Sequence, residues 1–170
     1  AIGGGSAIDS SKAIAYGLAN DFDLEDLFLG KVSTDKIAKI GAISTLAGTG
    51  SETSNSAVID IDTMGTKILK RSYNHECARP LFAIMNPELT YSLPAYQTAA
   101  PGADIMMHTM ERYFTTERDV ELTDEIAEGL LRTVKTMVPE ALAHPTSYTA
   151  RANLLLAGAK SHDGLTGLGR

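Results

Sequence analysis

Residues 1–6 read Ala1-Ile2-Gly3-Gly4-Gly5-Ser6, and they join the end of an apolar strand to a glycine turn. Residues 7–19 follow with helix formers and apolar side chains at Ile8, Ala15 and Leu18, which predicts an α-helix after the turn. Such a turn lets backbone N–H groups approach a phosphate, and the helix N-terminus adds partial positive charge. The stretch therefore predicts an α/β fold with a phosphate site. A turn that serves only packing is the alternative, because Ile8 replaces the third glycine of the usual G-x-G-x-x-G pattern.

The rest of the first half continues to mix short helical and strand-like segments. We expect a helical turn at Leu24–Phe28, strands at Ile40–Leu46 and Ala57–Asp62, a turn at Thr63–Thr66 and a strand at Leu81–Met85. The second half is helical in pattern. We expect a helix over Pro94–Phe114 that is interrupted at Pro101-Gly102, an amphipathic helix over Asp119–Met137 and a third helix over Tyr148–Lys160.

This order of elements predicts two parts. Residues 1–90 fit the C-terminal part of an α/β dinucleotide-binding domain, and residues 91–170 fit the start of an all-helical domain that is cut short. The opening strand needs neighbours to pair with, and the glycine-rich residues 164–170 form no closing element. We therefore expect the chain to be an internal portion of a longer protein.

Composition limits the kinds of partner. The formal net charge of the 170 residues is -6, with acidic and basic residues mixed along the chain, which argues against nucleic acid as the main partner. No apolar run approaches the length of a membrane span, so we expect no membrane partner. Cys77 is the single cysteine and cannot form an internal disulfide, which fits a cytoplasmic location.

A second polar motif follows the strand expected at residues 40–46. The segment at residues 44–54 is rich in hydroxyl groups and glycines, and includes Thr45, Thr49 and Ser51. Such a loop can satisfy phosphate and ribose oxygens while its glycines let the backbone come close. Lys70 can add positive charge to the same pocket. The alternatives are a polar surface loop and a solvated lysine.

The third motif places a carboxylate and an imidazole four residues apart, at Asp104 and His108. On a helix these side chains share a face, and Ala100, Met107 and Met110 make the rest of that face apolar. A buried carboxylate is costly unless it is compensated, and a divalent cation would compensate it. Oxygen and nitrogen ligands suit zinc or ferrous iron better than calcium or magnesium. The alternative is an Asp–His hydrogen bond at the helix surface.

These three motifs resemble, in order and distance, those of the iron-dependent (group III) alcohol dehydrogenases. Another stretch carries the resemblance further: Asn86-Pro87-Glu88-Leu89-Thr90-Tyr91-Ser92-Leu93-Pro94, followed by the Gly-Ala-Asp-x-x-x-His-x-x-Glu pattern of residues 102–111. Residues 151–153 and 164–169 are similar to the butanol dehydrogenase and aldehyde reductase branch. The resemblance implies a dehydroquinate synthase-like architecture, in which a dinucleotide-binding α/β part precedes a helical metal-binding domain.

The resemblance also implies roles for the motif residues. The pyrophosphate of NAD(P) would lie at Gly4, Gly5 and Ser6, with Asp9 nearby. Thr45, Thr49 and Ser51 would line the same cofactor, and Lys70 would reach its ribose or phosphate region. Asp104 and His108 would be the first two ligands of a divalent metal, Fe²⁺ or Zn²⁺. By the resemblance, two further histidine ligands would lie beyond residue 170. Neither His144 nor His162 falls where the family's ligands belong.

The expected activity is reversible hydride transfer between a primary alcohol, or its aldehyde, and NAD or NADP. The full-length enzyme is expected to be a homodimer. The 170 residues alone are expected to be inactive, because they supply half of the metal ligands. Two other interpretations stay open: a glycerol dehydrogenase-type enzyme of the same superfamily, and a non-catalytic nucleotide-binding module.

Overall fold

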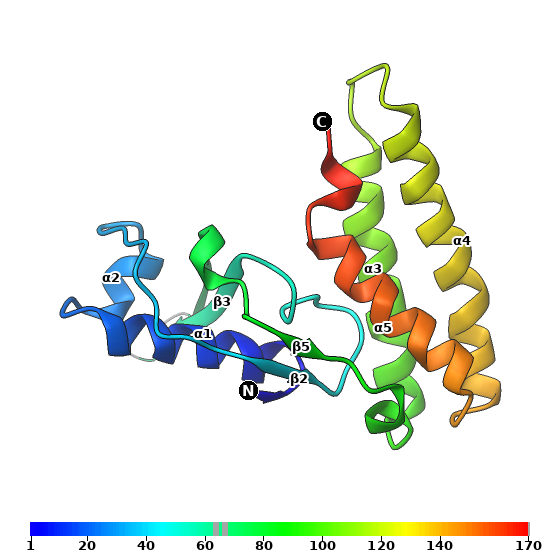
Figure 1. Cartoon of the computed structure of the whole chain (residues 1–170), viewed down its shortest axis with the longest axis horizontal. Helices are drawn as coiled ribbons and strands as arrows, with labels where there is room; N and C mark the ends of the chain where they lie inside the picture. The colour runs from blue at the N-terminus through cyan, green and yellow to red at the C-terminus, as the bar shows by residue number, and fades with distance from the viewer. Residues whose placement is uncertain (63–64, 66–67, 170) are drawn as a thin grey trace.

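The computed structural model describes residues 1–62, 65 and 68–169, and it shows a mixed α/β part beside a bundle of long helices (Figure 1). The fold class expected from the sequence is confirmed. The turn expected at Thr63–Thr66 lies outside the described residues except for Gly65.

A small parallel sheet carries the glycine turn. Its strands are β1 (Ile2–Gly3), β2 (Ala42–Ser44) and β5 (Ala83–Ile84), in the order β1-β2-β5. Ile2 pairs with Ile43, and Ile43 pairs with Ile84. Helix α1 (Gly5–Ala19) begins two residues after β1 ends, so the turn lies at the carboxyl end of the sheet. Ligands bind at that end of open α/β sheets, which makes it the place to look for a site.

Strands β2 and β5 are shorter than the ranges expected from sequence, 40–46 and 81–85. The flanking residues still make backbone hydrogen bonds: Leu81 N–H donates to the Ile40 carbonyl at 2.9 Å, and Thr45 N–H donates to the Gly3 carbonyl at 3.0 Å. The apolar runs therefore located β2 and β5 correctly but predicted longer strands than the sheet contains.

An antiparallel hairpin, β3 (Ser56–Asp62) and β4 (Ile68–Asn74), packs against α1. The sequence did not predict β4, because much of its length is exposed and Lys70 and Arg71 interrupt its apolar alternation. The short helix α2 (Leu24–Phe28) was predicted, and the Asp23 side chain caps it by accepting from Glu25 N–H. One core joins these elements, and its buried members are Ala13, Tyr16, Leu27, Phe28, Ala57, Ile61 and Ala78.

Three long helices form the second part: α3 (Ala95–Tyr113), α4 (Glu121–Ala143) and α5 (Tyr148–His162). Short 3-10 turns lie at Glu76–Ala78, Pro87–Thr90 and Leu165–Gly167. The helices bury a second apolar core, made of Ile105, Leu130, Val134, Ala141, Ala150, Leu154 and Ala157. Ala47, from the loop after β2, packs against this core and so connects the two parts of the chain.

The expected interruption of the first long helix is wrong. Helix α3 runs without a break through Pro101 and Gly102. Proline removes one helical hydrogen bond, but the packing of α3 against α4 and α5 outweighs that loss. Pro101 also has a neighbour outside its helix: a Cβ at Gly48 would lie 2.7 Å from the Pro101 Cβ, so the loop after β2 approaches α3 closely here.

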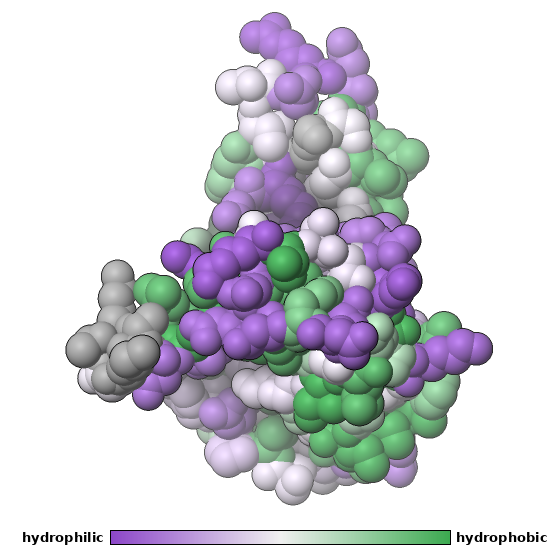
Figure 2. Space-filling view, turned by 90° about the vertical axis from the view of Figure 1, so that its left-hand side faces the viewer, coloured by the Kyte–Doolittle hydropathy of each residue, from purple (hydrophilic) through white to green (hydrophobic). Residues whose placement is uncertain are grey.

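The surface of the α/β part is mixed. Figure 2 shows hydrophilic side chains across the middle of this end of the molecule and an apolar area below them. Helix α1 contributes exposed apolar side chains at Ile14 and Leu18. Among the described residues, no helix has both the length and the apolar character that a membrane crossing requires.

Candidate functional site

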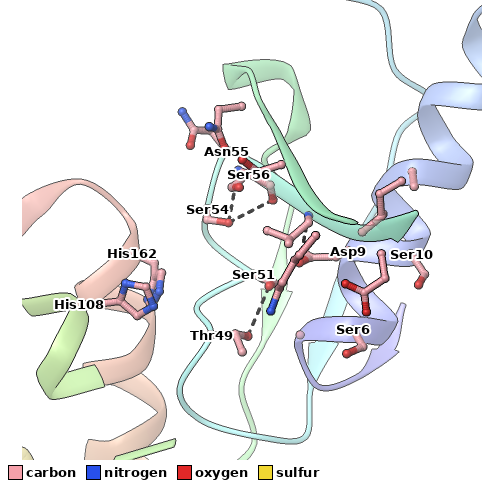
Figure 3. Close-up of a pocket in the computed structure, with 18 of the residues that line it drawn as sticks. Ser6, Asp9, Ser10, Thr49, Ser51, Ser54, Asn55, Ser56, His108 and His162 are labelled. Carbon is pink, nitrogen blue, oxygen red and sulfur yellow. Dashed lines mark hydrogen bonds between the residues drawn. The ribbon is translucent and has the colours of Figure 1, made fainter. Parts of the chain in front are cut away.

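A cleft of about 1370 Å³ separates the glycine turn from the helical part. Figure 3 shows His108 and His162 on the helical side, facing Ser6, Asp9, Thr49 and Ser51 across the open space. The lining residues on the α/β side include Gly5, Ser6, Asp9, Ser10, Thr49, Ser51 and Lys70, and those on the helical side are Asp104, His108, Glu111, Arg112 and His162. The cleft therefore brings together residues from all three sequence motifs.

The start of α1 forms one wall of the cleft. Its N-cap residue is Gly4, no side chain caps the helix, and its first turn carries no acidic residue. The first N–H groups of a helix have no partner within the helix, so they are available to an anion beside Gly5 and Ser6. The helix dipole favours negative charge at the same place. This wall is suited to a phosphate group.

The loop after β2 packs directly on the glycine turn. A Cβ at Gly5 would lie 2.6 Å from the Thr49 Oγ1, so only glycine allows this approach. Gly48 and Gly50, on either side of Thr49, have positive φ angles of 126° and 57°, which glycine adopts readily. Ser51 Oγ donates to Thr49 Oγ1 at 3.3 Å, which fixes both hydroxyl groups at the cleft wall. These hydroxyls and the α1 N-terminus make one continuous polar surface.

Asp9 lies beneath that surface. It is buried, with one carboxylate oxygen accepting from Val58 N–H at 3.2 Å. Its other oxygen, Oδ1, has no hydrogen-bond partner among the described residues. Burial raises the pKa of Asp9, while Lys12, the neighbouring Ser51 hydroxyl and the hydrogen bond from Val58 N–H act to lower it. A buried, half-satisfied carboxyl at a cleft wall is able to accept a hydrogen bond from a ligand.

Lys12 and Glu52 are buried close by. The Lys12 ammonium donates to the Ser54 carbonyl at 2.9 Å and to the Ser56 carbonyl at 2.7 Å. Burial lowers the pKa of Lys12 to about 8 and raises the pKa of Glu52. Neither residue lines the cleft. Lys12 therefore ties α1 to the segment after the Thr/Gly/Ser loop.

The structure does not bring every predicted cofactor residue to the cleft surface. Gly4 and Thr45 are not among its lining residues, while Gly5, Ser6, Asp9, Thr49, Ser51 and Lys70 are. Lys70 reaches the cleft from β4, where it stands opposite Asp60.

Asp104 and His108 lie one turn apart on α3 and both line the cleft. The carboxylate faces the imidazole as expected, but the side chains are 46% and 37% exposed, so the expectation that the carboxylate is buried is wrong. The helix turns this face toward the open cleft, and its buried positions are instead Ile105 and Thr109. His108 Nε2 lies 3.5 Å from the Asp104 Oδ1, and His108 Nδ1 lies 3.6 Å from the Glu111 Oε2.

This spacing fits a shared metal ion. At 3.5 Å the pair is longer than a good hydrogen bond. Two ligands at about 2.1 Å from one tetrahedral ion stand about 3.4 Å apart, which matches the pair. Among the described residues, however, no group of three or more His, Cys, Asp or Glu side chains is arranged to hold a metal. Asp104 and His108 thus offer two donor groups at a spacing compatible with one metal ion.

Three further residues reach the helical side of the cleft. His162 packs edge-to-face on His108, with ring centroids 4.2 Å apart, and burial lowers the pKa of His162, with His108 acting in the same direction. Arg112 Nη1 donates to the carbonyls of His108 at 2.9 Å and Ser161 at 2.8 Å. Glu111 lies beside His108. Sequence reasoning found no role for His162. The small residues Ala157-Gly158-Ala159 were the available signal, because they allow α5 to approach the loop after β2.

Comparison with known proteins identifies the family to which this chain is similar. The family described as "Iron-containing alcohol dehydrogenase" matches residues 1–87, and "Fe-containing alcohol dehydrogenase family, C-terminal" matches residues 98–165. NADH-dependent butanol dehydrogenase A of Clostridium acetobutylicum is 41% identical over 170 residues, which are all of this chain and 43% of that protein. NADPH-dependent aldehyde reductase YqhD of Escherichia coli is 34% identical, over 99% of this chain and 44% of its own length.

Solved structures show the same fold. The crystal structure of NADH-dependent butanol dehydrogenase A from Thermotoga maritima matches with a TM-score of 0.94 and 33% identity, covering 99% of this chain and 42% of that one. Sulfoacetaldehyde reductase from Bifidobacterium kashiwanohense, solved in complex with NAD+, matches with a TM-score of 0.83 and 33% identity, covering 98% of this chain and 43% of that one. The chain thus spans less than half the length of these relatives.

Proposed function

This chain belongs to the iron-containing alcohol dehydrogenase family, and we propose that it forms the dinucleotide- and metal-facing part of an NAD(P)-dependent alcohol dehydrogenase or aldehyde reductase. The observation that carries the proposal is the single cleft that has a phosphate-suited helix N-terminus on one wall and the Asp104–His108 pair on the other. Relatives named for NADH-dependent and NADPH-dependent reactions on alcohols and aldehydes support the substrate class.

The α/β wall binds the dinucleotide in this proposal. N–H groups at Gly5 and Ser6 hold the pyrophosphate, with Gly4 shaping the turn. Thr49 and Ser51 offer hydroxyl groups along the cofactor, and Thr45 supports the loop behind them. Asp9 lies near the cofactor at the cleft wall, and Lys70 adds positive charge on the β4 side.

The helical wall binds the metal, Fe²⁺ or Zn²⁺, through the Asp104 carboxylate and the His108 imidazole. When bound, the metal supplies Lewis acidity toward an alcohol or carbonyl oxygen, and the nicotinamide accepts or supplies the hydride. Two further ligands come from outside residues 1–170. We propose the division into an α/β part, residues 1–90, and the start of a helical domain, residues 91–170, because it separates the two binding walls.

A test uses the complete gene product, stripped of metal and then reloaded with Fe²⁺ or Zn²⁺. Oxidation of NADH and NADPH is followed with butanal as substrate. The His108→Asn variant is compared with His144→Asn, because His144 forms a similar i,i+4 pair with Glu140 at 3.1 Å on α4, away from the cleft. We expect His108→Asn to lower metal-dependent activity by more than about 100-fold, and His144→Asn to keep it.

Activity that survives in His108→Asn at the parent level would refute the metal role. The isolated 170-residue chain forms a further arm, and we expect it to show no dehydrogenase activity with either metal. A complete gene product that binds NADH but neither binds metal nor turns over butanal would instead support a non-catalytic nucleotide-binding module.

A further inference from the structure

We propose that His162 is a positioning residue that holds the His108 ring in its metal-facing orientation, an inference that rests on the proposed metal role of Asp104 and His108. The geometry that carries it is the edge-to-face contact between the two imidazoles, whose ring centroids are 4.2 Å apart with an interplanar angle of 64°. Figure 3 shows the two rings side by side at the cleft wall.

The His108 ring is weakly fixed by its charged neighbours. Its two nitrogens lie 3.5 Å from Asp104 and 3.6 Å from Glu111, and both distances exceed those of good hydrogen bonds. The ring is also 37% exposed, so the core of α3 does not enclose it. A half-exposed side chain without short hydrogen bonds keeps rotamer freedom, and ligation of a metal has to remove that freedom. A ring packed beside His108 removes part of this rotamer freedom before the metal binds.

His162 is itself firmly placed. Its Nδ1 lies 2.8 Å from Ser161 Oγ and 3.3 Å from the Gly158 carbonyl oxygen. On its other side, a Cβ at Gly50 would lie 2.5 Å from the His162 Cβ, so the loop backbone closes directly against the histidine. The His162 ring is therefore held between Gly50, in the loop after β2, and His108.

The backbones that carry the two rings are also tied together. Arg112 Nη1 donates to the His108 carbonyl and to the Ser161 carbonyl, which joins α3 to α5 at the level of the two imidazoles. The Thr53 hydroxyl donates to the Ala159 carbonyl at 3.2 Å and joins the loop to the same turn of α5. Because both ends of the contact are anchored, the rings keep their relative position. His162 then acts as an outer partner of the metal site, a class whose loss costs about 10- to 100-fold in metal affinity.

The test measures Co²⁺ binding by visible absorption in the complete gene product after metal removal. His162→Ala removes the ring, His162→Phe keeps a flat ring in contact with His108, and His144→Ala removes an exposed histidine outside the cleft. We expect His162→Ala to weaken Co²⁺ binding about tenfold and to lower kcat. The KM for NADH stays unchanged, and His162→Phe recovers affinity to within about threefold of the parent. His144→Ala should match the parent.

Three results would overturn the inference. Parent-like Co²⁺ affinity in His162→Ala shows that the ring contact does not position His108, while the proposed function stands. Equal loss in His162→Phe and His162→Ala, with shifted Co²⁺ bands, identifies His162 as a direct ligand instead. A parent protein that binds no Co²⁺ removes the proposed metal role itself, and the inference falls with it. Thermal unfolding of each variant shows that any loss of affinity occurs in a folded protein.

Discussion

Lys12 hydrogen-bonds the backbone of the cleft residues Ser54 and Ser56, and its burial disfavours the charged form of its ammonium group. Its ammonium is fully buried and donates to two backbone carbonyls, yet burial still lowers the pKa of Lys12 to about 8. Between pH 8 and the ordinary pKa of lysine, the unfolded chain therefore holds more of this proton than the folded chain does. The contribution of Lys12 to the free energy of unfolding rises with pH across that window.

The corresponding prediction compares the parent with Lys12→Met in urea unfolding between pH 8 and 9.5. In the parent, Lys12 contributes a rise of about 1 kcal/mol per pH unit to the free energy of unfolding, and Lys12→Met loses that contribution. Measurements stop at pH 9.5 because burial raises the pKa of Tyr16, which has the opposite effect above its ordinary pKa. Identical slopes in the two proteins would contradict the lowered pKa of buried Lys12.

At the site, the sequence motifs predicted which side chains line one cleft, but not the solvent exposure of those side chains. The spacing of Asp104 and His108 placed them on one helix face, and they do line one cleft. Their partial exposure was not predictable, because it depends on which face of α3 packs against α4 and α5. His162 was missed for a similar reason: its contact with His108 joins residues 54 positions apart and exists only through the packing of α5.

At the scale of elements, the packing of α5 on the loop after β2 requires the two backbones to approach closely at Gly158. A Cβ at Gly158 would lie 2.7 Å from the backbone nitrogen of Gly48, so α5 packs directly on the loop that carries Thr49. Helix α1 offers a contrast, because nothing lies within 4 Å of a Cβ at Gly17. The two glycines therefore have opposite roles, although both lie within helices.

We predict that Gly17→Ala raises the free energy of unfolding by up to about 1 kcal/mol, since alanine favours the helix. Gly158→Ala should lower it by about 1–3 kcal/mol, because the Gly48 backbone has to move, and should also weaken NADH binding through the displaced loop. Urea unfolding and NADH fluorescence titration measure the two effects. Stabilisation by Gly158→Ala with unchanged NADH affinity would show that the loop and α5 do not depend on each other.

Elements with strong local signals were predictable from sequence. Helix α2 has its expected bounds, and α3 and α5 lie within two residues of theirs. Helix α4 was expected to end at Met137 but continues through Pro139 to Ala143. Strand β4 was missed because it forms by pairing with β3, while its own sequence has no regular apolar alternation. The continuity of α3 through Pro101 was also missed, since tertiary packing decided it against the local preference of proline.

On the scale of the whole molecule, the cleft exists because the two parts of the chain are held together. Ala47 packs against the helical core, Thr53 bonds to α5, and the loop between them carries the Thr49 and Ser51 hydroxyl groups at the cleft. The distance between the two walls is therefore set by the same contacts that stabilise the fold. The proposed hydride transfer needs the dinucleotide and the metal side by side, and the cleft brings their two proposed walls together.

A crystal structure of the complete gene product with NAD(H) and Co²⁺, with the metal located from its anomalous scattering, tests the proposed two-walled site most directly. We predict a metal peak between the Asp104 carboxylate and the His108 Nε2, and a pyrophosphate against the backbone of Gly5 and Ser6 in the same cleft. A metal peak away from Asp104 and His108, or a dinucleotide bound outside this cleft, would contradict it.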